Sequence, residues 1–180
     1  MGNSAQVVVL SEDQQHQVFV YTWLRQRGIE RRKIRLLPVP AGRGAGEQYV
    51  REHYPKEVQT HRRRLGAQDC QLVTIIDADV LPTRQRVARL DQALRDAELE
   101  KRSPTERICI LVPKRNIETW IHFLVTGPVD EETDYKRPAK SAEECREAAR
   151  KLAETYPLEA APAEFPQSLR EGWSELKRAF

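Results

Sequence analysis

Acidic side chains follow three of the short apolar segments in this sequence, at the point where each segment ends. They are Glu12 and Asp13 after residues 6–10, Asp77 and Asp79 after residues 71–76, and Glu118 just beyond residues 107–112. Carboxylate oxygens are the ligands that Mg²⁺ and Mn²⁺ prefer, and Mg²⁺ takes only one or two of them while keeping several waters. This pattern therefore favours binding of a divalent metal ion.

The pair Asp77 and Asp79 carries most of this prediction. One residue separates the two, so both side chains point to the same side if the strand continues to Asp79. Two carboxylates held so close repel each other unless a cation lies between them. The alternative is that Asp79 caps the following turn while Asp77 lies in solvent. We favour the metal site because the pair directly follows a continuous apolar run.

The other acids are less specific. Glu12 falls near the start of a helical segment, where the helix dipole favours any acid, so capping is the simpler interpretation of this residue alone. Glu118 has the same interpretation, but its neighbour Arg115 and the adjacent apolar stripe leave a position in a cleft equally open. Ligands of an open parallel sheet bind outside the carboxyl ends of its strands, so the combination is the strongest functional signal in the chain.

Four apolar segments must position these acids, and helical patterns separate them. We expect strands at residues 6–10, 33–39, 71–76 and 107–112, and helices after each of them and near 141–155 and 167–178. Parallel neighbours need a crossover, which a helix supplies, so the alternation predicts an α/β fold with a mostly parallel central sheet of about four strands. We expect residues 1–127 to form this domain and residues 128–180 a C-terminal helical extension packed on it.

Capping residues predict several helix boundaries. Ser11 is the expected N-cap of the first helix and Gly28 its end, while Asn116 and Gly127 bound the helix that follows the fourth strand. Pro55 either kinks the second helix or begins a new one as its first-turn residue.

The composition indicates a folded protein without membrane segments. Of 180 residues, 39% are hydrophobic and 32% are charged, which suits one globular domain. No apolar run approaches the roughly 20 residues that span a bilayer, and the N-terminus lacks a secretion signal, so we expect a cytoplasmic protein. Cys70, Cys109 and Cys145 have no C-x-x-C spacing and are expected to be reduced, buried packing residues.

Basic and glycine-rich segments suggest phosphate contacts. The segment 41–46, AGRGAG, lacks the Gly-Lys-Ser/Thr of a Walker loop. Its backbone amides and Arg43 would suit contact with a phosphate, but a flexible connection is the favoured interpretation. The run at 61–64 contains Arg62, Arg63 and Arg64, which suit a nucleic-acid backbone but also a solvated helix face.

Further candidates lie close to the acids in the sequence. Lys114 and Arg115 follow the fourth strand directly, where they would neutralise a phosphate or pair with the acids. His16 and His122 each fall four residues after a candidate acid, and surface pairing is the expected role of both.

The arrangement resembles the TOPRIM fold of topoisomerases, primases and overcoming-lysogenization-defect nucleases, and most closely the small prokaryotic TOPRIM-like proteins of the RloB and DUF4276 kind. The similarity covers roughly residues 6–127 and a helix start at 166–170. It rests on Glu12 after the first strand, on Asp77-Ala78-Asp79 after the third, and on Glu118-Thr119-Trp120 in a later helix opening. The glycine that follows the first acid in that family is Asp13 here.

The resemblance implies a site and a chemistry. Asp77 and Asp79 would bind Mg²⁺ or Mn²⁺, Glu12 would share the metal or handle a proton, and Glu118 and Lys114 would complete the catalytic site. The implied reaction breaks or makes phosphodiester bonds, with nucleic acid as substrate. The resemblance also suggests a role in prokaryotic defence against phage or plasmids, with an ATPase or another subunit of the defence system as protein partner.

Two other functions remain open from the sequence. A non-catalytic binding or regulatory subunit of the same fold is consistent with the missing glycine after Glu12. A phosphatase of the haloacid dehalogenase type also has a D-x-D after a strand, and Asp77-Ala78-Asp79-Val80 fits its motif in part. That motif belongs on the first strand, whereas this one follows the third, so this function ranks last.

Overall fold

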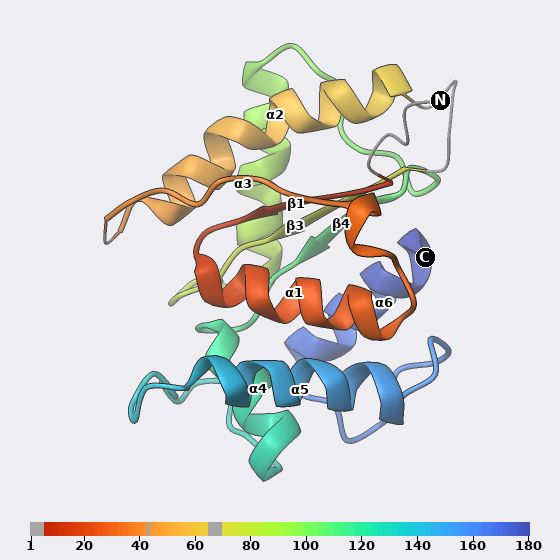
Figure 1. Ribbon diagram of the computed structural model, residues 1–180. Coiled ribbons are helices and arrows are strands. Elements are labelled where there is room, and N and C mark those ends of the chain that lie inside the picture. Colours follow the sequence, from red (N-terminus) through yellow and green to blue (C-terminus); the bar gives the residue numbers. More distant parts are fainter. Residues whose placement is uncertain (1–5, 43, 65–69) are drawn as a thin grey trace.

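A sheet of four parallel strands forms the centre of the protein in the computed structural model, which describes residues 6–42, 44–64 and 70–180 (Figure 1). The strands are β1 (Val7–Ser11), β2 (Ile34–Leu36), β3 (Gln71–Ile75) and β4 (Ile108–Leu111), in the order β2-β1-β3-β4. Every pairing between them is parallel. The predicted α/β fold with a mostly parallel sheet of about four strands is confirmed.

Helices cover both faces of the sheet. They are α1 (Gln14–Gln26), α2 (Gly46–Arg64), α3 (Thr83–Asp96), α4 (Ile117–Thr126), α5 (Ala142–Thr155) and α6 (Gln167–Ala179), with a short 3-10 turn at Arg31–Lys33. Figure 1 shows α2 and α3 on one face and α1 and α6 on the other, with α4 and α5 further out. The outer helix α5 packs against both α1 and α4.

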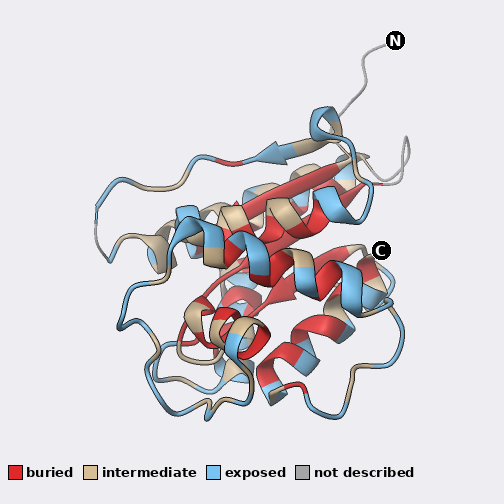
Figure 2. Ribbon diagram, turned by 60° about the horizontal axis from the view of Figure 1, so that its bottom comes forward, coloured by how far each residue is buried: buried red, intermediate tan, exposed pale blue. Residues whose placement is uncertain are grey.

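Alternating side chains divide the core between the two faces. Along β1, Val7 and Val9 join the cluster beneath α1, α4, α5 and α6, whereas Val8 and Leu10 join the cluster beneath α2 and α3. Both faces of the central strands are therefore buried, as their continuous apolar character requires (Figure 2). Trp173 of α6 lies in the first cluster, so the C-terminal helices share a core with the sheet.

The helix boundaries follow the predicted caps with one exception. Gly127 ends α4 with a φ of 123°, a left-handed conformation that favours glycine. Asn116 is the N-cap residue of α4, although its side chain donates to Asp134 instead of capping. Pro55 lies inside α2, which continues through it. The prediction of Ser11 as an N-cap is wrong, because β1 extends through Ser11 and buries it.

The outer edge of β4 is covered by side chains of α6 and its neighbours. The carboxylate of Glu175 accepts a hydrogen bond from the Ile110 backbone N–H at 2.9 Å, and Arg102 and Arg178 donate to the Ile108 carbonyl. An edge strand with unpaired backbone groups invites pairing with other chains, so these contacts protect the sheet.

Two expectations from composition can be compared with the structure. The three cysteines are free and buried, as predicted. None of the described helices has the length and apolar character needed to cross a membrane.

Candidate metal centre

The candidate site lies where the direction of chain connection reverses in the sheet. The chain leaves β1 toward β2 on one side, while β3 lies on the other side of β1. The carboxyl ends of β1 and β3 are level, with Ser11 opposite Ile75. Such a point is where ligands of open parallel sheets bind, and the residues that follow these two strands are Glu12 and Asp77.

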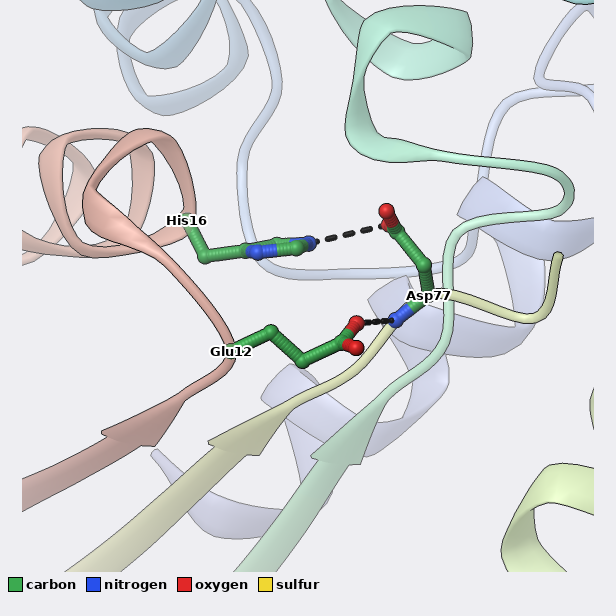
Figure 3. Close-up of side chains that lie close together, drawn as sticks. All are labelled: Glu12, His16 and Asp77. Carbon is green, nitrogen blue, oxygen red and sulfur yellow. Dashed lines mark hydrogen bonds and ion pairs between the residues drawn. The ribbon is translucent and has the colours of Figure 1, made fainter. Parts of the chain in front are cut away.

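Glu12, His16 and Asp77 converge at this point. Figure 3 shows the Glu12 and His16 side chains, both from the segment after β1, directed toward Asp77. The Glu12 carboxylate accepts a hydrogen bond from the Asp77 backbone N–H at 2.6 Å, and His16 Nε2 lies 2.9 Å from Asp77 Oδ1. One potential ligand atom from each residue lies within 4.8 Å of the others. We call these three residues the Glu12 triad.

Asp13 fixes the position of His16. It is the N-cap of α1, and its Oδ1 accepts the His16 backbone N–H at 2.9 Å. The same oxygen lies 3.0 Å from His16 Nδ1 in an ion-pair contact. The ring, which is fully buried, therefore has one nitrogen facing Asp13 and the other facing Asp77. The sequence predicted that His16 pairs with an acid at the surface, and that prediction is wrong because the ring is buried.

Burial and neighbouring charges have competing effects on the pKa values of the site. Burial disfavours the charge on His16, but Asp77 and Asp13 outweigh it and raise the pKa of the imidazole well above its ordinary value. Burial, with the negative charge of Asp77, raises the pKa of Glu12 to about 7. For Asp13, burial is outweighed by the contacts with His16, which lower the pKa of the carboxyl to about 2. Asp77 and Asp13 therefore favour the protonated form of the His16 ring.

Asp79 lies apart from the triad. The strand ends at Ile75, and Asp79 has a φ of 53°, so the expectation of an extended segment that aligns both aspartates is wrong. Its carboxylate is 2.9 Å from Arg86 Nη2, a guanidinium that is almost completely buried and also lies 2.9 Å from Glu47. Asp79 still lines the same cleft, but its charge is already compensated by Arg86.

A cleft of about 480 Å³ opens over Glu12 and Asp77 of the triad. Its lining residues are Glu12, Asp13, Gly42, Gly44, Gly46, Glu47, Asp77, Asp79 and Lys136. Three glycines of the predicted glycine-rich loop therefore lie at the site, while Arg43 is outside the described residues. A Cβ added to Gly46 would be 2.8 Å from both the Cβ and the carbonyl oxygen of Glu12, so only glycine permits this close approach.

Lys136 is a site residue that the sequence analysis missed. It comes from the charged segment between α4 and α5, where no spacing or apolar pattern distinguishes one lysine from its neighbours. In the fold this segment passes the carboxyl ends of the strands, and Lys136 becomes a basic group in the acidic cleft.

The remaining candidates, which follow β4 in the chain, lie in different places relative to the triad. Glu118 is half-buried, and burial and the charge of Asp77 raise the pKa of its carboxyl, but it is neither a member of the triad nor among the residues that line the cleft. Lys114 lies 3.4 Å from both the Leu81 carbonyl and Glu132, and it lines a separate pocket. Arg115 pairs through its backbone with Asp79.

The basic run lies beside the amino ends of the strands, opposite the carboxyl ends where the triad lies. The helix α2 begins beside Glu12, and its 19 residues extend about 27 Å to Arg64. Near that end, His61 Nδ1 is 3.1 Å from the sulfur of Cys70, which precedes β3. Arg62 binds both carboxylate oxygens of Glu106 at 2.6 and 3.0 Å. The predicted phosphate ligands Arg62, Arg63 and Arg64 therefore lie far from the Glu12 triad.

His122 differs from His16. Its ring stacks on Tyr135 with centroids 4.6 Å apart, and burial with the nearby Lys140 lowers the pKa of its imidazole. It does not belong to the triad.

Comparison of the chain with protein-family models, with curated proteins and with solved structures gave no match. The resemblance to TOPRIM-like proteins therefore rests on the quoted residues and remains an expectation.

Proposed function

We propose that the protein is a TOPRIM-type nuclease or a related enzyme that processes phosphodiester bonds with Mg²⁺ or Mn²⁺ in the cleft over the Glu12 triad. The observation that carries this proposal is the convergence of Glu12, His16 and Asp77 at the reversal point of the sheet. Glu12 and Asp77 are separated by 65 positions, so the fold alone brings them together.

The donor set is compatible with a divalent ion. Asp77 and Glu12 supply carboxylate oxygens, and one or two such groups suffice for Mg²⁺ or Mn²⁺ when water completes the shell. Each carboxylate retains one oxygen that is free of the contacts described above, because Glu12 uses Oε2 and Asp77 uses Oδ1. A cation would also offset the negative charge of Asp77, which together with burial raises the pKa of Glu12.

The groups around the cleft suit hydrolysis of a phosphate ester. A bound metal ion supplies charge stabilisation for the phosphoryl oxygens in the transition state. The Glu12 carboxylate would share the metal ion or accept a proton from an attacking water. Lys136 offers a positive charge to the phosphate, and the glycines at 42, 44 and 46 let backbone approach closely.

Only the resemblance to TOPRIM-like proteins supports a proposal for the biological setting. A role in prokaryotic defence against phage or plasmids, with a protein partner such as an ATPase, would place a nucleic-acid substrate in this cleft. Nucleic acid that reached the cleft and the basic run together would have to follow the length of α2, about 27 Å.

The test compares the wild-type protein with Asp77→Asn. Cleavage of bis(p-nitrophenyl) phosphate and of labelled DNA and RNA is measured in Mg²⁺ and in Mn²⁺, and metal binding is measured by calorimetry. We expect Asp77→Asn to lose both, while Asp96→Asn, an exposed acid on α3, keeps them. Parental cleavage by Asp77→Asn would refute the proposal. Metal binding by the wild type without turnover on any substrate would favour the non-catalytic subunit instead.

A further inference from the structure

We infer that the Glu12 triad binds a first-row transition ion of the Mn²⁺ or Fe²⁺ class through His16 Nε2, in preference to Mg²⁺. Asp77 and Glu12 are the oxygen ligands. This inference rests on the proposed metal site and specifies the ion that the site selects. It concerns His16, a residue that a purely carboxylate site does not contain.

The chemistry of the donor set gives the first argument. Mg²⁺ is a hard cation that favours carboxylate, carbonyl and water oxygens, whereas imidazole suits transition ions. His16 is fully buried and has a carboxylate beside each ring nitrogen. A histidine that is buried only for packing needs neither carboxylate. A site with one nitrogen and two carboxylates resembles the ligand sets of Mn²⁺ and Fe²⁺ more than those of Mg²⁺.

The distances give the second argument. His16 Nε2 and Asp77 Oδ1 are 2.9 Å apart. Two adjacent ligands around an octahedral ion, with bonds of about 2.1 Å, are about 3 Å apart. The two atoms already have this separation, and the third ligand atom, from Glu12, lies within 4.8 Å of both. An ion at this position would take the place of the proton between Nε2 and Asp77 Oδ1, which is released on binding, and the Glu12 carboxylate would move toward the ion.

The position of Asp13 gives the third argument. Histidine ligands of metal ions almost always direct the second ring nitrogen at a carboxylate, carbonyl or water, which fixes the ring and strengthens the ligand. Here Asp13 Oδ1 lies 3.0 Å from His16 Nδ1 and also holds the His16 backbone N–H. Nε2 thereby faces Asp77 Oδ1, beneath the carboxylates that line the cleft. Asp13, which stands where the resembled family has glycine, acts as a positioning residue for the ligand.

The deciding experiment detects the nitrogen directly in the wild-type protein. Mn²⁺ is added to the full chain, and pulsed electron paramagnetic resonance measures the coupling between the ion and nitrogen nuclei. We expect the coupling of one directly bound imidazole, which changes when histidine is labelled with ¹⁵N. Bound Mn²⁺ without this coupling would overturn the inference and leave the proposed function to the Asp77→Asn test. Failure of both Mn²⁺ and Mg²⁺ to bind would overturn both proposals.

Affinity measurements on variants give an independent readout. Loss of the free Mn²⁺ signal gives the Mn²⁺ dissociation constant, and competition gives that of Mg²⁺. We expect His16→Gln to weaken Mn²⁺ binding about 10- to 100-fold while Mg²⁺ binding changes much less, and Asp13→Asn to act in the same direction. His61→Gln is the matched control, since His61 is a buried histidine at the far end of α2. An unchanged ratio of Mn²⁺ to Mg²⁺ affinity in a folded His16→Gln protein would contradict the inference.

Discussion

His16 Nε2 lies 2.9 Å from Asp77 Oδ1, although 61 positions separate the two residues in the chain. The contact joins the first turn of α1 to the segment after β3, and it exists only because β1 and β3 are neighbours in register. Asp13 holds the other side of the ring, so a cap of α1 also orients a candidate ligand. The local structure of a helix start and the chemistry of the cleft therefore depend on the same carboxylate.

The two aspartates of the D-x-D motif are expected to differ in importance. Asp79 is 51% exposed and paired with Arg86, whereas Asp77 belongs to the triad. We expect Asp79→Asn to change the Mn²⁺ dissociation constant by less than about threefold, because its charge is already compensated. Asp77→Asn is expected to weaken binding at least tenfold, roughly the loss of one charged ligand. Calorimetric titration of both variants measures this, and equal losses would show that both aspartates are ligands.

Substitution of Gly46 is expected to disturb the site by displacing Glu12, although no ligand residue is replaced. In Gly46→Ala the new Cβ would lie 2.8 Å from the Cβ and carbonyl oxygen of Glu12, so the loop or Glu12 must move. We expect weaker metal binding and a free energy of unfolding reduced by about 1–3 kcal/mol, as for other overpacked sites. Calorimetric titration and urea unfolding measure the two effects.

Gly44→Asn is the control for Gly46→Ala. Gly44 lines the same cleft, has open space where a Cβ would be added, and has a φ of 79°, which asparagine tolerates better than most residues. A Gly44→Asn protein that loses metal binding as much as Gly46→Ala would show that any change in the loop has this effect, and the contact with Glu12 would not be the cause.

Much of the fold was predictable because its signals are local. Continuous apolar runs gave the strands, and Gly127 marked the end of α4 through its left-handed conformation. The position of Ser11 was not predictable in this way, because the end of β1 depends on its neighbour: Ser11 pairs with Ile75 and is drawn into the sheet. A capping preference is weaker than this pairing.

The site was predictable only for residues whose position follows from the strand that directly precedes them in the sequence. Glu12 and Asp77 follow strands, so their meeting at one edge could be expected. The role of His16 could not, because its burial depends on the packing of α1 and on an aspartate 61 positions away. Arg86 redirects Asp79 through a contact between the start of α3 and the turn after β3. Such long-range pairings leave no periodic signal in the sequence.

Acid is expected to weaken the attachment of α6 to β4 through Glu175. Burial alone would raise the pKa of this carboxyl, but Arg102 outweighs burial and lowers it below the ordinary value of 4.5. The stabilisation is therefore complete above pH 4.5 and is lost as the pH falls through the lowered pKa of the folded state. At pH 7 we expect Glu175→Gln to reduce the free energy of unfolding by about 1–3 kcal/mol, typical of hydrogen bonds to charged groups.

Urea unfolding between pH 7 and pH 3 measures the effect of Glu175. The difference between wild type and Glu175→Gln is expected to shrink below pH 4.5, because the wild-type carboxyl becomes protonated there. Glu154→Gln, an exposed acid on α5, is the control and is expected to stay within about 0.5 kcal/mol of the wild type at every pH. A difference that is constant across this range would mean that the charge of Glu175 does not stabilise the fold.

The contact between α6 and α4 is expected to depend on the absence of a side chain at Gly172. In Gly172→Ala the added Cβ would lie 2.7 Å from Cη2 of Trp120. Alanine favours a helix over glycine by about 1 kcal/mol, so two effects of opposite sign compete. The indole of Trp120 is fully buried and donates from Nε1 to Ser168 Oγ at 2.7 Å, so it has little freedom to give way. Overpacking costs about 1–3 kcal/mol, and we expect a net loss of unfolding free energy.

Two further variants separate the contributions to the Gly172→Ala result. Ser174→Ala, at an exposed position of the same helix, reports helix propensity together with the loss of the hydrogen bond from Ser174 Oγ to the Arg170 carbonyl, and is expected to be close to neutral. Ser168→Ala removes the hydrogen bond that holds the indole, so Gly172→Ala is expected to cost less in that background than in the wild type. Thermal unfolding of the four proteins of this cycle gives the coupling between the two sites. A stabilised Gly172→Ala protein would show that Trp120 moves aside at little cost.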